Sequence, residues 1–125
     1  MTQARLRTGR VAEGIVAATL EASGWQIVQR NARTRQGEID IVALDGATLV
    51  FVEVKAARAG TERGPVRPIH AIDFRKQRRV RRLASAWMAE RRGLPFYDAI
   101  RFDAVGVVLD SAGRALDLEH VPNAF

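Results

Sequence analysis

The chain has 125 residues, enough for one domain with a single core, and 47% of them are hydrophobic. It contains no cysteine, which excludes disulfides and thiolate metal sites and fits the reducing cytoplasm. No apolar run approaches the roughly 18 residues of a membrane-spanning helix, and the basic start is not followed by the apolar stretch of a signal peptide. We therefore predict a single cytoplasmic domain over residues 1–125, with no membrane partner.

The net charge is +6, and arginine makes up 18 of the 20 basic residues. Arginine forms paired hydrogen bonds with phosphate, so this balance predicts a polyanionic partner, in the first place nucleic acid. The alternative is a general bias towards arginine, which would explain the choice of arginine over lysine but not the excess over acidic residues. A membrane surface is disfavoured because no basic amphipathic stretch has an exposed bulky apolar face.

Residues 8–23 predict a helix that ends at Gly24, a frequent C-terminal stop. Its apolar residues recur at intervals of three and four and form the stripe Val11, Ile15, Ala18 and Ala22. Glu13 lies beside the centre of this stripe, at a position where a glutamate is ordinarily solvated.

Residues 25–30 predict a first strand, and residues 31–36 predict a basic polar connection. Arg30, Arg33 and Arg35 stand just ahead of a group of carboxylates in the sequence. They are candidates to bind a phosphate backbone beside that group, although an ordinary solvated loop would carry the same residues.

Residues 37–55 predict a β-hairpin whose arms are rich in β-branched and apolar residues and meet at Asp45-Gly46, a strong two-residue turn signal. This turn fixes a register in which Leu44 lies opposite Ala47, Asp40 opposite Phe51 and Glu38 opposite Glu53. Side chains alternate along a strand, so one face carries Glu38, Asp40, Glu53 and Lys55. The other face is assigned to the core and carries Ile39, Ile41, Val50, Val52 and Val54.

Asp40 and Glu53 become diagonal neighbours on the charged face, at the roughly 7 to 8 Å across which two carboxylates can lean together over one cation. Charges at strand positions that favour Val or Ile are typical of functional sites. A solvated edge pair or an arginine partner would explain a single carboxylate equally well. An Asp followed on the adjacent strand by Glu-x-Lys favours a site.

Residues 56–72 contain two glycines and two prolines, so the segment has too many helix-breaking residues for a helix and is too long for a tight turn. Long connections of this kind are often binding loops, so we predict a mobile segment that becomes ordered on DNA. Its candidate phosphate ligands are Arg58, Arg63 and Arg67.

Asp73 can cap a second helix that extends to about Arg92. Its buried stripe is predicted as Val80, Leu83, Ala84, Trp87 and Met88, and its surface arginines as Arg75, Arg78, Arg79 and Arg82. The first turns also carry Lys76 and Gln77, where free backbone donors and the positive end of the helix dipole favour phosphate. Candidate nucleic-acid ligands at this end of the helix are Lys76, Arg78 and Arg79.

Residues 97–103 and 105–109 predict two further strands, residues 110–113 a turn, and residues 115–121 a last strand. The order of helix, three strands, helix and strands predicts an α/β fold, a mixed β-sheet with helices on its faces. His70 and His120 have no second ligand at metal spacing, so we assign both to structural or solvated positions.

Asp40, followed thirteen residues later by Glu53-Val54-Lys55, resembles the PD-(D/E)xK nuclease signature, with Ile39 in place of the proline. The wider set resembles the small bacterial YraN-like family: Gly37-Glu38-Ile39-Asp40, Phe51-Val52-Glu53-Val54-Lys55, Lys76-Gln77-Arg78-Arg79, Arg101-Phe102-Asp103 and Asn123-Ala124-Phe125. The short signature alone is a weak signal, whereas the ordered set spans nearly the whole chain. The resemblance implies a restriction-endonuclease-like core similar to that of archaeal Holliday-junction resolvases.

The resemblance also implies roles for individual residues. Asp40, Glu53 and the Val54 carbonyl would hold Mg²⁺ or Mn²⁺, ions that prefer oxygen ligands. Lys55 would orient or deprotonate the attacking water. Glu13 and Gln77 match positions that assist such sites: Glu13 would complete the metal shell through water, and Gln77 would tune it together with Glu38.

The expected activity is metal-dependent hydrolysis of phosphodiester bonds by a DNA endonuclease, and the likeness to resolvases directs it towards branched or junction DNA. Two symmetric cuts on a junction need two active sites, so this version also implies a homodimer. Two alternatives stay open: a nucleic-acid-binding accessory protein with the same fold and no turnover, and a protein-interaction module whose arginines meet an acidic partner. Intact Asp40, Glu53 and Lys55 favour the enzyme.

Overall fold

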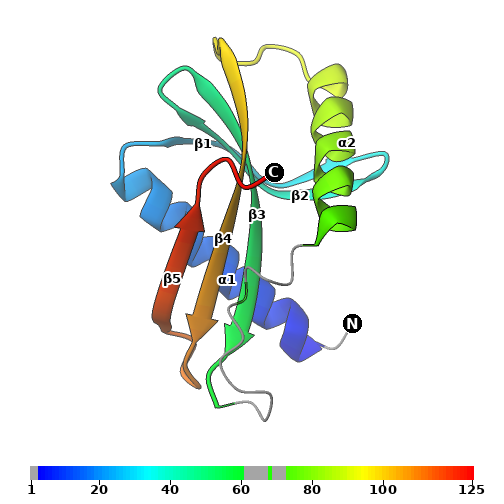
Figure 1. The fold of residues 1–125 in the computed structure, drawn as a ribbon. Helices are drawn as coiled ribbons and strands as arrows, with labels where there is room; N and C mark the ends of the chain where they lie inside the picture. Colours follow the sequence, from blue (N-terminus) through cyan, green and yellow to red (C-terminus); the bar gives the residue numbers. More distant parts are fainter. Residues whose placement is uncertain (1–2, 61–67, 69–72) are drawn as a thin grey trace.

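The computed structural model describes residues 3–60, 68 and 73–125. Its elements are α1 (Gln3–Ala22), β1 (Gln26–Thr34), β2 (Gly37–Asp45), β3 (Thr48–Arg58), α2 (Phe74–Glu90), β4 (Ala99–Leu109) and β5 (Ala115–Val121) (Figure 1). The strands form one sheet in the order of the sequence, with β3 and β4 parallel and all other neighbours antiparallel. The predicted α/β fold on a mixed sheet is therefore confirmed. Among the described residues, neither helix combines the length and apolar content needed to cross a membrane.

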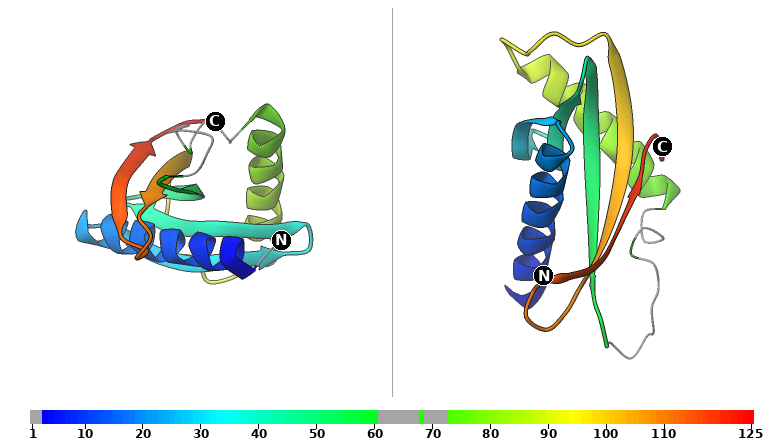
Figure 2. Two further views of the ribbon diagram at one scale, coloured as in Figure 1. Left: turned by 90° about the horizontal axis from the view of Figure 1, so that it is seen from below. Right: turned by 90° about the vertical axis from the view of Figure 1, so that its left-hand side faces the viewer.

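The two helices cover opposite faces of the sheet, because side chains of the central strand β3 alternate between them (Figure 2). Val50 and Val52 pack against α1, whereas Leu49 and Phe51 pack against α2. All four side chains are fully buried. Burial on both faces explains why β3 is an almost continuous apolar run up to Glu53.

The second helix begins and packs as predicted. Asp73 caps it, since its Oδ1 accepts a hydrogen bond from the Lys76 N–H at 3.0 Å. The buried stripe comprises Val80, Leu83, Ala84 and Trp87, with Met88 partly buried. The indole N–H of Trp87 donates to Gln29 Oε1 at 2.9 Å, so this buried aromatic residue also links α2 to β1.

The first helix faces the sheet with a different stripe from the one predicted. Its buried residues are Ala12, Val16, Ala17 and Leu20. Val11 is 36% exposed, and Ala18 and Ala22 are exposed as well. A row that contains Val16 and Leu20 buries more apolar surface than one that ends in two alanines, which accounts for the rotation. The helix also begins at Gln3, upstream of the predicted residue 8.

Strand β1 is longer than predicted and includes most of the basic segment 31–36. Its pairing with β2 extends from Gln26↔Leu44 to Thr34↔Gly37. Backbone groups in this polar segment find their hydrogen-bond partners in β2, so its composition does not prevent strand formation. Only residues 35–36 form the turn, where Thr34 Oγ1 accepts from the Gln36 N–H at 3.1 Å and donates to the Gly37 carbonyl at 2.9 Å.

The β2–β3 hairpin forms, but its turn lies one residue later than predicted. Asp45 pairs with Thr48, so the loop consists of Gly46 and Ala47. In this loop only Gly46 has positive φ, at 60°. A type II′ turn needs glycine only at its first central position, whereas the predicted turn would have placed Asp45 there. The register consequently shifts by two residues, which keeps the alternation of faces.

The corrected register places the two central carboxylates opposite each other at the point where β2 and β3 separate. The last pair of these strands is Ile41↔Val52, and the next two positions are Asp40 and Glu53. Beyond them β2 pairs only with β1, and β3 only with β4. Ile39 packs with α2 although the sequence assigned it to the same face as Ile41, which packs with α1. The cause is the stronger twist of a two-stranded ribbon, here β1–β2.

Strands β3 and β4 also differ in length from the prediction. β3 continues to Arg58, so the first residues of the predicted loop 56–72 are strand. β4 is one strand where two were predicted, because its parallel pairing with β3 continues without interruption through the buried Ala104. β5 matches the predicted residues 115–121. Residues 61–67 and 69–72, with Arg63, Arg67 and His70, lie outside the described residues.

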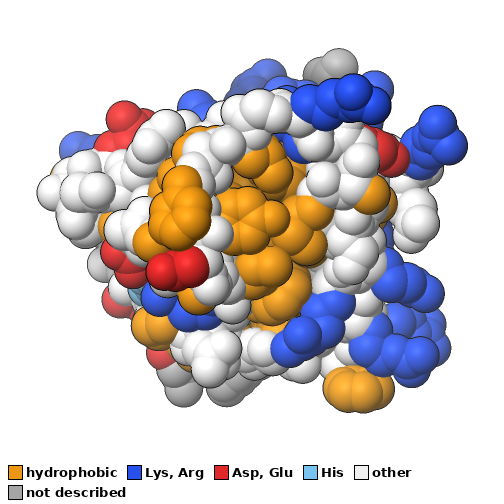
Figure 3. All heavy atoms as spheres, turned by 90° about the horizontal axis from the view of Figure 1, so that it is seen from above, with side chains coloured by type: hydrophobic (Ala, Val, Ile, Leu, Met, Phe, Trp, Pro, Cys, Tyr) orange, Lys and Arg blue, Asp and Glu red, His pale blue; other side chains and the backbone are white. Residues whose placement is uncertain are grey.

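Basic side chains are concentrated on the α2 side of the molecule. Seen from above, hydrophobic side chains occupy the centre of the view, and many Lys and Arg side chains lie on the side where α2 stands (Figure 3). The exposed arginines of α2 are Arg75, Arg78, Arg79, Arg81 and Arg82. We call these five residues the α2 arginine ridge.

Candidate active site

Asp40 bridges the gap that opens between β2 and β3. Its Oδ2 accepts a hydrogen bond from the Val54 N–H at 2.8 Å, as a neighbouring strand would do in a continuous sheet. The N–H and C=O of one strand residue point to the same edge, so the Val54 carbonyl also faces the gap. This geometry fixes Asp40 and places a backbone oxygen near its carboxylate.

Two glutamates approach Asp40 from different elements. Glu53 is its neighbour on β3, Glu13 comes from α1, and both carboxyl groups lie close enough to Asp40 to exchange a hydrogen bond with it when one of them is protonated. All three residues are half-buried. Helix α1, which carries Glu13, packs on the opposite face of the sheet from α2. Both Glu13 and Glu53 can approach Asp40 because β2 and β3 separate at this point. We call Glu13, Asp40 and Glu53 the carboxylate cluster.

Burial raises the pKa of every member of the carboxylate cluster, and the charge of Asp40 adds to the rise at Glu13 and Glu53. Burial is the largest cause at Glu53, followed by the charge of Asp40, and the pKa of Glu53 rises from 4.5 to about 8. Burial, Asp40 and Glu38 raise the pKa of Glu13 from 4.5 to about 7. Burial also raises the pKa of Asp40, against the opposing hydrogen bond from Val54. The cluster therefore retains protons near neutral pH that a bound cation would displace.

Basic side chains of β3 and α2 lie next to the carboxylate cluster. Lys55 follows Glu53 on the same face of β3 and meets Lys76 near the start of α2. Burial, and then contact with Lys76, lowers the pKa of Lys55, while Glu53 and Asp40 oppose this shift. Arg79 lies close enough to Glu53 for its charge to lower the pKa of that carboxyl. The cluster thus has positive groups on its α2 side.

Gly37 provides the room that Arg79 occupies. A Cβ atom at Gly37 would lie 3.1 Å from Arg79 Nη2 and 3.2 Å from Leu83 Cδ2, closer than ordinary van der Waals contact. The φ of Gly37 is 146°, which side-chain-bearing residues rarely adopt. Both requirements explain why glycine begins the strand that carries Asp40.

Strand β1 contributes one predicted residue and one that the sequence analysis missed. Arg30 lies close enough to Glu13 for its charge to lower the pKa of that carboxyl. The missed residue is Asn31. Its amide is assigned with the nitrogen, rather than the oxygen, towards the two carboxylates, because an oxygen there would face only acceptors; the nitrogen is then 2.7 Å from Glu13 Oε2 and 3.0 Å from Glu38 Oε1. The β1–β2 register would have indicated it, since Arg30↔Ile41 and Ala32↔Ile39 place Asn31 opposite Asp40.

Other predicted site residues lie elsewhere. Arg33 and Arg35 are exposed near the β1–β2 turn, and Arg78 lies over the Phe74 ring, 5.6 Å from its centroid. Arg58 Nε donates to Thr8 Oγ1 at 2.9 Å, which ties β3 to α1. Gln77 is half-buried, and its backbone N–H donates to the Asp73 carbonyl in the first turn of α2. The α2 residues next to the site are instead Lys76, which meets Lys55, and Arg79, whose charge acts on Glu53.

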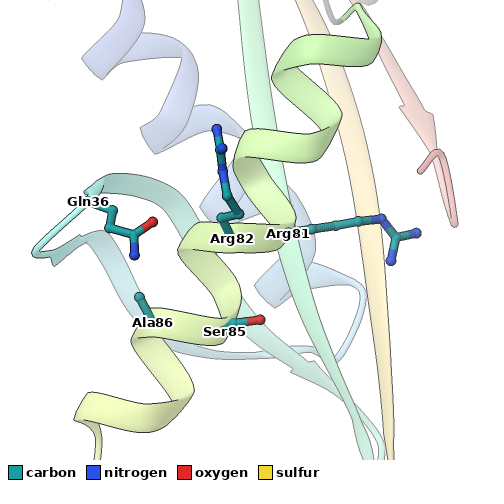
Figure 4. Close-up of a pocket in the computed structure, with 5 residues that line it drawn as sticks. All are labelled: Gln36, Arg81, Arg82, Ser85 and Ala86. Atoms are coloured by element: carbon teal, nitrogen blue, oxygen red, sulfur yellow. The ribbon is translucent and has the colours of Figure 1, made fainter.

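A pocket of about 470 Å³ lies between α2 and the β1–β2 turn, apart from the carboxylate cluster. It is lined by Gln36, Arg81, Arg82, Ser85 and Ala86 (Figure 4). Arg81 points away from Gln36 and is engaged elsewhere, because its Nη2 donates to the Phe125 carbonyl at 2.6 Å and its guanidinium lies over Phe102. A lining without carboxylates does not suit a cation, so the pocket is not the predicted metal site.

A second carboxylate, Asp103, shows what a structural charge pair looks like in this chain. Asp103 is fully buried and accepts hydrogen bonds from His120 Nε2 at 2.8 Å, Arg101 Nε at 2.8 Å and the Asn123 N–H at 2.9 Å. Burial alone would raise its pKa, but the bonds from His120 and Arg101 hold that pKa below its usual value. His120, which the sequence assigned to a structural or solvated position, takes part in this buried charge pair.

The donor set of the carboxylate cluster suits a hard divalent cation that keeps part of its water shell. Across the described residues, no three His, Cys, Asp or Glu side chains are arranged as a preformed metal-binding group. Mg²⁺ does not require one, because it is commonly held by one or two carboxylates, several waters and substrate phosphate. Asp40, Glu53 and the Val54 carbonyl provide such a partial set.

The pKa shifts predict an unusual dependence of stability on pH in the presence of a chelator. The folded chain binds protons at Glu13 and Glu53 that the unfolded chain releases at its ordinary pKa of 4.5. Stability should therefore fall as the pH rises from about 5 to about 8, because the folded state holds more protons across this window. The melting temperature measured in EDTA should show this slope.

Glu53→Gln should flatten the slope because it removes the group with the higher pKa, and excess Mn²⁺ should flatten it by replacing the protons. The matched control is Glu90→Gln, a substitution at an exposed glutamate at the end of α2. Equal slopes in wild type, Glu53→Gln and the control would contradict the raised pKa of Glu53.

Known proteins similar to this chain cover nearly its whole length. Residues 12–107, which include the whole carboxylate cluster, match the family described as "Uncharacterised protein family UPF0102". The chain is 42% identical over 118 residues to a UPF0102 protein of Geobacter metallireducens, covering 94% of this chain and 90% of that protein. It is 41% identical over 125 residues to one of Moorella thermoacetica, covering 100% of both. A Frankia alni UPF0102 protein is 43% identical over 117 residues, covering 94% and 92%.

Proposed function

We propose that this chain, which belongs to the uncharacterised protein family UPF0102, is a metal-dependent endonuclease that hydrolyses phosphodiester bonds in DNA. The observation that carries the proposal is the carboxylate cluster with Lys55 beside it. In a structural charge pair the partner lowers the pKa of the carboxyl, as at Asp103. In the cluster the pKa values are raised instead, which is typical of functional sites.

Each residue of the site has a task in this reaction. Asp40 and Glu53, with the Val54 carbonyl, would hold Mg²⁺ or Mn²⁺ in the gap between the strands. When bound, the ion would polarise a phosphoryl oxygen and acidify a water ligand. Lys55 would position or deprotonate the attacking water, and the contact with Lys76 supports the second role by lowering the pKa of Lys55.

The α2 arginine ridge supports nucleic acid as the substrate. Its five arginines are exposed residues of the helix whose Lys76 meets Lys55 and whose Arg79 acts on Glu53 by its charge, so a DNA backbone bound along α2 would reach the carboxylates. The finer assignments, a PD-(D/E)xK core and branched DNA as substrate, rest on the resemblance of Asp40 and Glu53-Val54-Lys55 to that signature. A homodimer belongs to the junction-cutting version alone.

The direct test is cleavage of end-labelled duplex, flap, single-stranded and four-way DNA, each with Mg²⁺, Mn²⁺ or EDTA. We expect cuts only with a divalent ion, and preferential cutting of the four-way substrate under the junction version. Binding without cleavage under every condition would favour an accessory protein without turnover. Absence of both DNA binding and metal binding would favour the protein-interaction alternative.

Binding to DNA in EDTA should weaken with salt, because each neutralised phosphate releases condensed counterions. The logarithm of the affinity should fall with the logarithm of the salt concentration by about 0.9 per phosphate contact. Arg78→Ala, which removes one member of the α2 arginine ridge, should reduce this slope by about one contact. Arg114→Ala is the matched control, since Arg114 is exposed on the β4–β5 turn and paired with Asp110. Equal slopes for the two variants would place the DNA elsewhere.

A further inference from the structure

Asn31 adopts a backbone conformation that β-strands rarely contain. Its φ is 50°, inside a strand whose register with β2 continues on both sides of it. Asparagine is among the few side-chain-bearing residues that tolerate this region. Such outliers persist where the surroundings hold them, and they cluster at active sites. The position of Asn31 opposite Asp40 puts this outlier beside the carboxylate cluster.

The side chain of Asn31 connects two carboxylates from different elements. Its amide nitrogen donates to Glu13 Oε2 of α1 at 2.7 Å and to Glu38 Oε1 of β2 at 3.0 Å. An amide has two N–H donors, so both bonds can form together. Glu13 also interacts with Asp40. Glu13 is therefore held from two sides, by Asn31 and by Asp40.

A neutral donor suits this position better than a basic residue. The charge of Arg30 already acts on Glu13, and arginine or lysine at position 31 would add a second positive charge next to the place where a cation is expected, with which it would repel. An amide fixes the orientation of Glu13 without adding charge. Partners that orient ligands in this way are a recurrent part of metal sites.

We propose that Asn31 is a positioning residue that orients Glu13 towards the metal shell held by Asp40 and Glu53. This inference rests on the proposed nuclease function, because Glu13 matters there only as part of that shell. The positive φ follows from the same requirement, since it lets the amide reach Glu13 and Glu38 from a strand that pairs with β2.

The test uses Asn31→Gly, which keeps a residue that tolerates positive φ and removes the side chain with its amide. The melting temperature in EDTA should stay close to that of wild type. Mn²⁺ affinity by calorimetry and single-turnover DNA cleavage should each fall about 10- to 100-fold, the usual effect of losing a residue that orients a metal ligand. The matched control is Asn123→Gly, at the other described asparagine with positive φ (54°), and it should behave as wild type.

A double mutant tests whether Asn31 acts through Glu13. Residues that work as one unit lose activity non-additively, so Asn31→Gly combined with Glu13→Gln should cleave no more slowly than Glu13→Gln alone. Multiplied losses, or wild-type cleavage and metal affinity in Asn31→Gly, would overturn the assignment. If Asn31→Gly does not fold, Asn31→Asp serves as the second variant. Aspartate preserves the size of the side chain and tolerates positive φ, but it replaces the N–H donor with an acceptor. DNA cleavage by Asn31→Asp should fall as much as expected for Asn31→Gly, and cleavage at the wild-type rate would refute the role of Asn31. If the wild-type protein neither binds Mn²⁺ nor cuts DNA, both the proposed function and this inference are refuted. If the wild-type protein is active and Asn31→Gly is unaffected, only the inference is refuted.

Discussion

Asp40→Asn should abolish detectable Mn²⁺ binding and DNA cleavage while leaving the fold intact. The asparagine oxygen can still accept the hydrogen bond of the Val54 N–H, which Asp40 receives at 2.8 Å, so the gap between β2 and β3 keeps its bridge. What is lost is the negative charge between Glu13 and Glu53, and with it the central ligand of the proposed ion. Removing that charge also relieves repulsion, so the melting temperature in EDTA should not fall.

The measurement combines calorimetry with Mn²⁺, cleavage of labelled DNA, and DNA binding in EDTA, which should persist. Asp117→Asn, at an exposed aspartate of β5, serves as the control and should leave all three unchanged. Glu53→Gln should resemble Asp40→Asn, and Glu13→Gln should be milder if its contact with the ion is through water. A purely structural cluster would show the reverse pattern, with lower melting temperatures in the variants and no metal affinity in wild type to lose.

The sequence predicted the parts of this fold that depend on local periodicity. A run of β-branched and apolar residues that includes Val50 and Phe51 identified the central strand, and Asp73 marked the start of α2 correctly. A register error of two residues keeps the alternation along β3, so Val50 and Val52 share a core face as predicted. The face of Ile39 and the residue opposite Asp40 were predicted wrongly.

Features that depend on contacts between elements could not be predicted in this way. The rotation of α1 was decided by packing of Val16 and Leu20 on the sheet, and the place of Ile39 by the twist of β1–β2 away from β3. Asn31 carried no motif of its own, since its role depends on the pairing of β1 with β2. Gly37 was part of a motif, but the need for glycine there comes from the close approach of the Arg79 and Leu83 side chains, which only the structure shows.

Lys55→Ala should separate catalysis from binding, because it removes no proposed ligand of the ion. Mn²⁺ affinity, measured at a pH above about 8 where Glu53 has lost its proton, should stay near that of wild type. DNA binding should also persist, since the α2 arginine ridge is untouched. Cleavage should be at least about 100-fold slower, the usual scale for losing one positioned acid–base or electrostatic group.

Lys55→Arg distinguishes the two roles open to this lysine. Arginine keeps a positive charge but does not give up its proton, so it can support an electrostatic role and cannot act as a base. Burial and Lys76 both lower the pKa of Lys55, which favours proton transfer, and we therefore expect Lys55→Arg to be as slow as Lys55→Ala. Recovery of most of the rate by arginine would assign Lys55 to charge stabilisation. Wild-type rates in both variants would remove Lys55 from the reaction and leave its burial beside Glu53 and Lys76 as a structural feature.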